Sequence, residues 1–92
     1  MIKISPFIKN IEELTLRNKY FRNVIYTSSN LQLVLMTLLP GQEIGKETHR
    51  NVDQFFRIES GKGQIVIGND SYIIGEGAAI KKKKNTIHNI IN

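Results

Sequence analysis

Short apolar runs separated by turn-forming residues make up most of this chain. Residues 21–27 and 31–39 are rich in β-branched, aromatic and aliphatic side chains, and the polar residues 28–30 separate them. The second run is apolar at successive positions, which is typical of a strand that is covered on both faces. Proline and glycine at positions 40–41 then end it. This pattern predicts two strands joined by a short turn.

The later part of the chain continues this pattern, with glycine at its turns, and a late strand is expected to carry His88. Three strands are expected before it, at 54–59, 64–67 and 71–74. Glycine-containing turns follow them, at 60–63, 68–70 and 75–77. Short strands with a turn roughly every 8–12 residues predict an all-β sandwich, barrel or jelly roll.

Residues 10–17 form the helix candidate of the chain. Asn10 can cap its N-terminus, and Glu13 stands three residues on, where a capping-box carboxylate reaches back to the cap. A chain of 92 residues is long enough for one domain and too short for two. We therefore expect a single domain, with an N-terminal arm and short helix over residues 1–19 and a β-barrel over residues 20–92.

Composition excludes several classes of site. The chain has no cysteine, so neither a disulfide framework nor a thiolate metal site is possible. No run approaches the roughly 18 consecutive apolar residues that a membrane span needs. The first residues also lack the charged and apolar regions of a secretion signal. We expect a cytoplasmic protein without a membrane partner.

The net charge of +5 comes largely from the lysine run Lys81–Lys84. A solvated loop is the commonest meaning of such a run. A nucleic-acid contact is a second reading, which the lack of interleaved aromatic residues or a recognised nucleic-acid motif disfavours. In a third reading, Lys83 and Lys84 border a pocket and attract an anionic small molecule, because they precede the strand of His88.

The two histidines of the chain are His49 and His88. If residues 47–49 are extended, Glu47 and His49 lie on one face, because side chains alternate along a strand. The chain can then return Gln54 to that face, and His88 can close the group from the opposite side. Imidazole, carboxylate and amide oxygen together suit Mn, Fe, Ni or Zn. Hydrogen-bonded histidines and a surface ion pair for Glu47 stay open as alternatives.

The spacing of these residues resembles the two motifs of the cupin family, G-x5-H-x-H-x(3,4)-E-x6-G and G-x5-P-x-G-x2-H-x3-N. The matching positions are Gly41, His49, Gly61, Gly77, His88 and Asn92. Residues 53–57 read DQFFR, which is similar to short bacterial cupins. The resemblance covers about residues 10–92. It implies a double-stranded β-helix, the jelly-roll barrel of cupins, with an internal metal or small-ligand site.

Four positions depart from these motifs. Glu47 stands where the family has its first metal histidine, and Gln54 stands where it has a ligand glutamate. Asp53, next to Gln54, could replace that glutamate. Lys83 and Asn85 take the places of the proline and the glycine of the second motif.

The resemblance implies a divalent transition metal ion held by His49 and His88. Glu47 is then a third ligand or a general base, and Gln54 is a ligand or a group that positions substrate. The ligand-binding residues expected around the metal are Gln54, Phe56, Lys83 and Lys84. Two functions fit this set of residues. One is a metal-dependent enzyme for a small metabolite, such as a sugar or sugar phosphate. The other is a non-catalytic binding or structural cupin with a degenerate metal site.

Packing and association can also be predicted. The aromatic residues expected in the core or pocket wall are Tyr26, Phe55, Phe56 and Tyr72, with one of each strand-adjacent pair facing inward. Resembling cupins continue with further strands beyond the position of Asn92, so the C-terminal strands of this chain look shortened. An exposed strand edge favours association, and we expect a homodimer.

Overall fold

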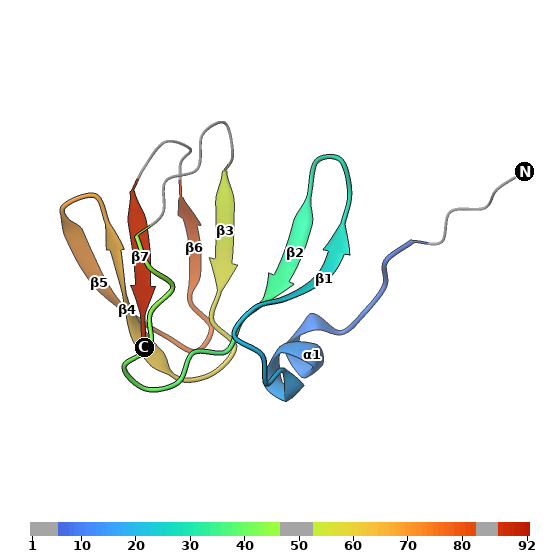
Figure 1. Ribbon diagram of the computed structural model, residues 1–92, viewed down its shortest axis with the longest axis horizontal. Helices are drawn as coiled ribbons and strands as arrows, with labels where there is room; N and C mark the ends of the chain where they lie inside the picture. The colour runs from blue at the N-terminus through green and yellow to red at the C-terminus, as the bar shows by residue number, and fades with distance from the viewer. Residues whose placement is uncertain (1–5, 47–52, 83–86) are drawn as a thin grey trace, which may run out of the picture. The chain divides into compact units, whose positions relative to one another are not determined.

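Short antiparallel strands dominate the computed structural model, which describes residues 6–46, 53–82 and 87–92 (Figure 1). The elements are α1 Ile11–Arg17, β1 Asn23–Thr27, β2 Gln32–Leu35, β3 Gln54–Arg57, β4 Lys62–Ile67, β5 Asp70–Gly75, β6 Ala79–Lys82 and β7 His88–Ile91. The prediction of strands with a short N-terminal helix is confirmed. No helix in the described part of the chain is long and apolar enough to cross a membrane.

The chain divides into two compact units, Met1–Thr37 and Leu38–Asn92. The N-terminal unit contains α1 and the antiparallel pair β1–β2. The C-terminal unit contains the pair β3–β6 and a three-stranded sheet in the order β5-β4-β7. The single-domain organisation expected from the sequence stays a prediction.

Helix α1 begins at the residue that the sequence indicates. The Asn10 side-chain oxygen accepts a hydrogen bond of 3.0 Å from the Glu13 amide, which satisfies one of the free N–H groups of the first turn. The Glu13 carboxylate lies 2.7 Å from the guanidinium of Arg17, one turn further along. The predicted N-cap at Asn10 is confirmed, whereas the Glu13 carboxylate, expected to reach back to the cap, pairs with Arg17.

Replacing Asn10 with alanine is expected to destabilise α1 by about 0.5–2 kcal/mol, because the Glu13 amide loses its acceptor. Hydrogen exchange of that amide, followed by NMR, should be faster in Asn10→Ala and close to the wild-type rate in Asn10→Asp. Lys9→Ala, an exposed neighbouring substitution, is the control. An unchanged exchange rate in Asn10→Ala would contradict the cap.

The β1–β2 pair forms the rest of the N-terminal unit. Its register shifts between Val24 and Tyr26, which marks a bulge in β1. The Ser28 amide donates to the Leu31 carbonyl at 2.7 Å, so the turn lies where it was predicted. Tyr26 is partly buried and packs on Phe7 at a ring-centroid distance of 5.0 Å, which confirms its packing role.

The core of the C-terminal unit is a cluster of buried isoleucines from three strands: Ile65 of β4, Ile74 of β5 and Ile90 of β7. Strand β4 lies between the other two, and Ile65 is the register partner of both Tyr72 and Ile90. The aromatic prediction is wrong for Tyr72, which is exposed. It lies two residues before Ile74, and burial along β5 begins only at Ile74.

Strand β7 has hydrogen-bonded neighbours on both sides. It pairs with β4, and on its other side the Ile44 amide donates to the Ile90 carbonyl at 2.9 Å. The Asn92 amide likewise donates to the Gln42 carbonyl at 2.9 Å. The last strand of this chain is therefore covered on both edges by its own unit. The homodimer stays a prediction.

Candidate functional site

The inner face of β3 and β6 can be identified from the residues that reach the isoleucine core. Phe56 of β3 and Ile80 of β6 pack against this core, and they are register partners. Phe55 is 68% exposed, so one member of the Phe55–Phe56 pair faces inward, as predicted. Because side chains alternate along a strand, Gln54 shares the inner face with Phe56, and Lys82 shares it with Ile80.

Gln54 and Lys82 lie directly opposite each other on this inner face. They are register partners at one end of the β3–β6 ladder, where β3 begins and β6 ends. The side chain of Lys82 is one of the most deeply buried in the protein, at 1% exposure. Directly opposed residues have Cβ atoms about 5 Å apart, so the amide and the ammonium can serve the same ligand.

His88 reaches the same interior from the other sheet. It is the first residue of β7, pairs with Ile67 of β4 and is 1% exposed. Two residues further on, Ile90 belongs to the core, so both side chains face inward. The His88 ring lies 5.6 Å from the Phe56 ring, centroid to centroid, at an interplanar angle of 51°. This contact joins the two sheets next to Gln54.

Gln54, Lys82 and His88 form the polar cluster of this interior. The side-chain oxygen of Gln54 has no protein donor in the part of the chain that the structure describes. The Gln54 Oε1 atom is buried there and accepts no hydrogen bond from residues 6–46, 53–82 or 87–92. A buried acceptor without a partner destabilises a protein by about 1–3 kcal/mol. The interior therefore holds an acceptor that a bound molecule or ion can satisfy.

The remaining predicted site residues, Glu47, His49, Lys83 and Lys84, lie outside the described residues. They adjoin the cluster in sequence, because β3 begins at Gln54 and β6 ends at Lys82 (Figure 1). Among the described residues, no three His, Asp or Glu side chains gather in a way that could hold a metal ion. A metal site around His88 would therefore need the donors of residues 47–49.

Asp53 is not a substitute for the ligand glutamate. Its side chain is 58% exposed, and its carboxylate lies 3.6 Å from the Lys81 ammonium. Lys81 precedes Lys82 on β6 and therefore faces the outside of the sheet. The sequence suggestion that Asp53 could take over from Gln54 is wrong for this reason.

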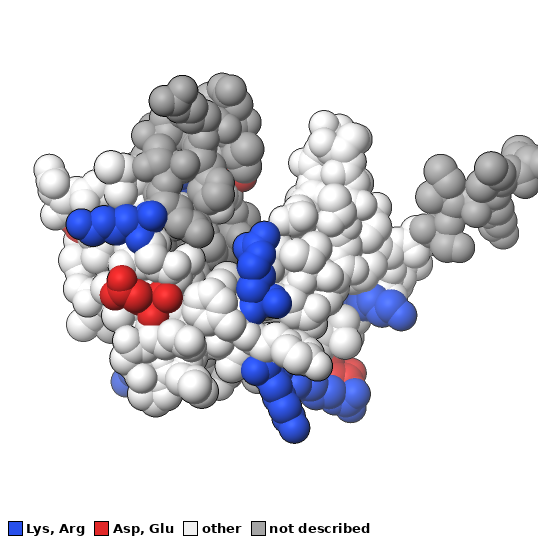
Figure 2. Space-filling view, in the orientation of Figure 1, with Lys and Arg blue, Asp and Glu red and all other residues white. Residues whose placement is uncertain are grey.

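The reading of the lysine run as a solvated loop is wrong for its first half. Lys81 and Lys82 end strand β6, and Lys82 faces inward. Residues 79–82 were not predicted as a strand, and the buried position of Lys82 opposite Gln54 was not predicted. The signal was available in the pattern, since Lys82 stands two positions after Ile80 and shares its face in any extended chain. Figure 2 marks Lys and Arg side chains of the described residues on one face of the molecule.

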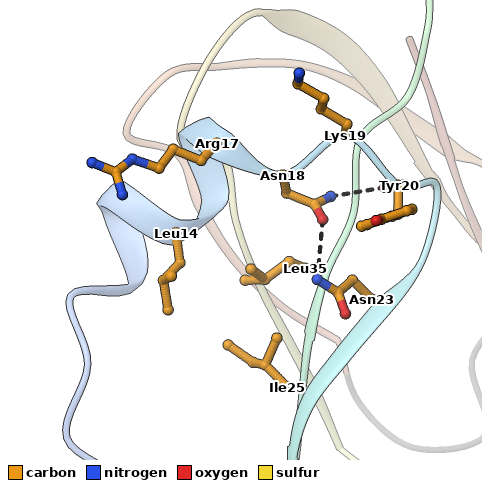
Figure 3. Close-up of a pocket in the computed structure, with 8 residues that line it drawn as sticks. All are labelled: Leu14, Arg17, Asn18, Lys19, Tyr20, Asn23, Ile25 and Leu35. Atoms are coloured by element: carbon orange, nitrogen blue, oxygen red, sulfur yellow. Dashed lines mark hydrogen bonds between the residues drawn. The ribbon is translucent and has the colours of Figure 1, made fainter.

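A hollow lies within the N-terminal unit, between α1 and the β1–β2 pair (Figure 3). It measures about 410 Å³, and Leu14, Ile25 and Leu35 form its apolar part. The Asn18 amide nitrogen donates to the Tyr20 carbonyl at 2.8 Å, and Figure 3 shows this amide directed to its protein partners. None of the site residues predicted from the sequence lines it.

Comparison with known proteins identifies relatives over nearly the whole chain. The chain is 40% identical over 93 residues to the uncharacterised protein YrkC of Bacillus subtilis strain 168, and this match covers 95% of the chain and 50% of YrkC. It is also 40% identical over 89 residues to an uncharacterised protein of Acanthamoeba polyphaga mimivirus, over 94% of the chain and 56% of that protein. The chain thus spans about half the length of these curated relatives.

The fold is also that of a solved protein. The crystal structure of BH2720 from Bacillus halodurans is 36% identical, with a TM-score of 0.93 over 96% of this chain and 71% of that one. The model of the Cupin domain family matches residues 34–92, which include every strand of the C-terminal unit. These matches confirm the resemblance seen in the motifs, and the chain belongs to the cupin family.

Proposed function

We propose that the interior of the C-terminal unit binds a small polar molecule, with a divalent metal ion held by His88, Glu47 and His49. The observation that supports the proposal is the Gln54 Oε1 atom, which is buried without a hydrogen-bond partner among the described residues, together with the buried His88 on the facing sheet. Both are buried polar groups, and Phe56, which packs against the isoleucine core, contacts the His88 ring. Polar groups that converge in an apolar cavity are typical of small-molecule sites.

The residues of this chain have separate parts in such a site. The metal ligands, two imidazoles and a carboxylate, suit Mn, Fe, Ni or Zn, and a bound ion would polarise an oxygen of the substrate. Phe56 packs on the His88 ring and restrains its orientation. Gln54 presents its oxygen to a donor of the ligand, and the isoleucines keep water out. Glu47 acts as the third ligand or as a general base.

A metal-free binding module is a second candidate function. Glu47 and Gln54 stand where the family motif has a metal histidine and a ligand glutamate. Among the described residues, no three His, Asp or Glu side chains gather in a way that could hold a metal ion. In this alternative, the site keeps its polar ligand and the metal ligands serve as hydrogen-bonding groups.

Metal content decides between the two functions. Protein purified without added metal and without a histidine tag should contain close to one equivalent of Mn, Fe, Ni or Zn by mass spectrometry. His88→Ala should lose this metal, because an imidazole ligand is removed. Phe55→Leu is the matched control, since the Phe55 side chain is 68% exposed, faces away from the interior and leaves every proposed donor atom in place.

Each outcome has a distinct meaning. Metal in the wild type and in Phe55→Leu, but not in His88→Ala, supports the metal site. An ion that binds the folded state must stabilise it. If the wild type is purified without metal and none of the four ions raises its melting temperature, the metal site is contradicted and the metal-free module is favoured. Circular dichroism on each variant separates loss of a ligand from loss of the fold.

A further inference from the structure

We infer that Gln54 is the specificity-determining residue of the interior site, and that the ligand it selects carries a hydroxyl or N–H hydrogen-bond donor. The inference rests on the proposed function, since it names the chemical class of the molecule that the interior binds. It starts from the Gln54 Oε1 atom, which is buried and accepts no hydrogen bond from the described residues.

The strand that carries Gln54 directs its side chain to the interior. Gln54 begins β3, and Phe56, two residues further on, packs against the isoleucine core. Side chains two residues apart share one face of a strand. Phe56 also contacts the His88 ring, at 5.6 Å between the ring centroids. The Gln54 amide therefore shares the inner face with the ring that joins the two sheets.

Other side-chain amides of the same unit have partners within the protein. Asn89 of β7 is 6% exposed, and its Oδ1 atom accepts a hydrogen bond of 2.8 Å from the Gly45 amide. Gln64 of β4 is exposed, and its amide nitrogen donates to the Ser71 hydroxyl. The Gln54 oxygen is buried like that of Asn89, but it has no donor in the described part of the chain.

The chemistry of this oxygen determines what the ligand must offer. A buried acceptor without a donor destabilises a protein, and an amide oxygen can only accept. A ligand therefore satisfies it by donating from a hydroxyl or an N–H group, whereas an ether oxygen or a methylated nitrogen in the same place leaves it unpaired. Sites built around such a hydrogen bond reject analogues without the donor more strongly than an apolar pocket rejects a changed methyl group.

The thermal stability of the ligand-free protein tests the first step. Gln54→Met replaces the amide with an apolar group of similar length, so the unpaired acceptor is removed and the melting temperature should rise by at least about 5 °C. Gln64→Met, the same change at an exposed position of β4, is the control and should stay within about 3 °C of the wild type. An unchanged or lower melting temperature in Gln54→Met would overturn the inference, because the chain itself would then supply the donor.

Matched pairs of probes test the ligand class on the full chain. Cyclohexanol is compared with its methyl ether, and pyrrolidone with N-methylpyrrolidone, in NMR titrations of ¹⁵N-labelled protein. In each pair, a methyl group replaces the one hydrogen that can be donated. The wild type should bind the donor of at least one pair at least about tenfold more tightly than its methylated partner. Preference within the first pair assigns an alcohol, and preference within the second assigns an N–H compound.

Two variants show whether Gln54 causes this preference. Gln54→Met should reduce it to about twofold or less, which separates hydrogen bonding from the size of the methyl group, and Gln54→Glu, which keeps an acceptor oxygen, should retain it. A preference that persists in Gln54→Met, or no binding of any probe, would contradict the inference.

The proposed function is judged separately, by the metal content of the same proteins. Metal that is present in the wild type and lost in Gln54→Met would make the oxygen a metal ligand, which keeps the metal site and rejects the inference. Metal in both proteins without any preference for the donor probes has the same meaning. A donor preference in a metal-free wild type supports the inference within the metal-free module.

Discussion

Replacing Ile65 with alanine is expected to lower the free energy of unfolding by about 2–5 kcal/mol. Ile65 is 1% exposed and lies in the central strand of the β5-β4-β7 sheet, where it packs with Ile74 and Ile90. Because β4 is held on both sides by hydrogen-bonded strands, it cannot close over the lost volume, and a cavity is left. The loss is a large part of the roughly 5–15 kcal/mol that stabilises a small domain.

Ile73→Ala is the matched control for this substitution. It removes the same atoms from the neighbouring strand β5, but the Ile73 side chain is 88% exposed. Its effect on unfolding should stay below about 1 kcal/mol. Urea denaturation followed by circular dichroism measures both. Similar midpoints for the two variants would show that Ile65 does not anchor the core of this unit.

The difference between Ile65 and Ile73 also marks what the sequence can predict. Alternation along a strand shows which residues share a face, and it correctly separated Phe55 from Phe56. It does not show which face is covered, because this depends on the sheet that packs there. The sequence therefore predicted Tyr72 in the core, although burial along β5 begins only at Ile74.

The candidate site was predictable where spacing carries the information. His88 was identified from the glycine and asparagine around it, and the structure places it inside. Lys82 was not identified, since a run of four lysines has the composition of a solvated loop and composition ignores alternation. The pairing of Gln54 with Lys82 depends on the register of two strands 22 residues apart at their closest (57 to 79). Turn chemistry and periodicity do not determine a register over that distance.

Replacing Gly63 with alanine is expected to destabilise the protein by about 1–3 kcal/mol through contact with the last strand. A Cβ atom at this position of β4 would lie 2.6 Å from the Ile91 carbonyl oxygen, which is backbone and cannot rotate away. Strand β7 would have to move from β4 at this point. Because β7 begins at His88, we expect the shift to reach the candidate site and to weaken the binding of the metal ion or ligand proposed above.

Gly75→Ala provides a control of opposite sign. The nearest atom to a Cβ there is the Lys62 side-chain Cγ at 3.7 Å, an ordinary contact. Alanine also restricts the unfolded chain more than glycine does, so Gly75→Ala should be neutral or stabilise by up to about 1 kcal/mol. Both variants restrict the unfolded chain in the same way. The difference between their urea midpoints therefore isolates the clash with Ile91. If Gly63→Ala is as stable as Gly75→Ala, β4 and β7 do not approach as closely at this point as the structure shows.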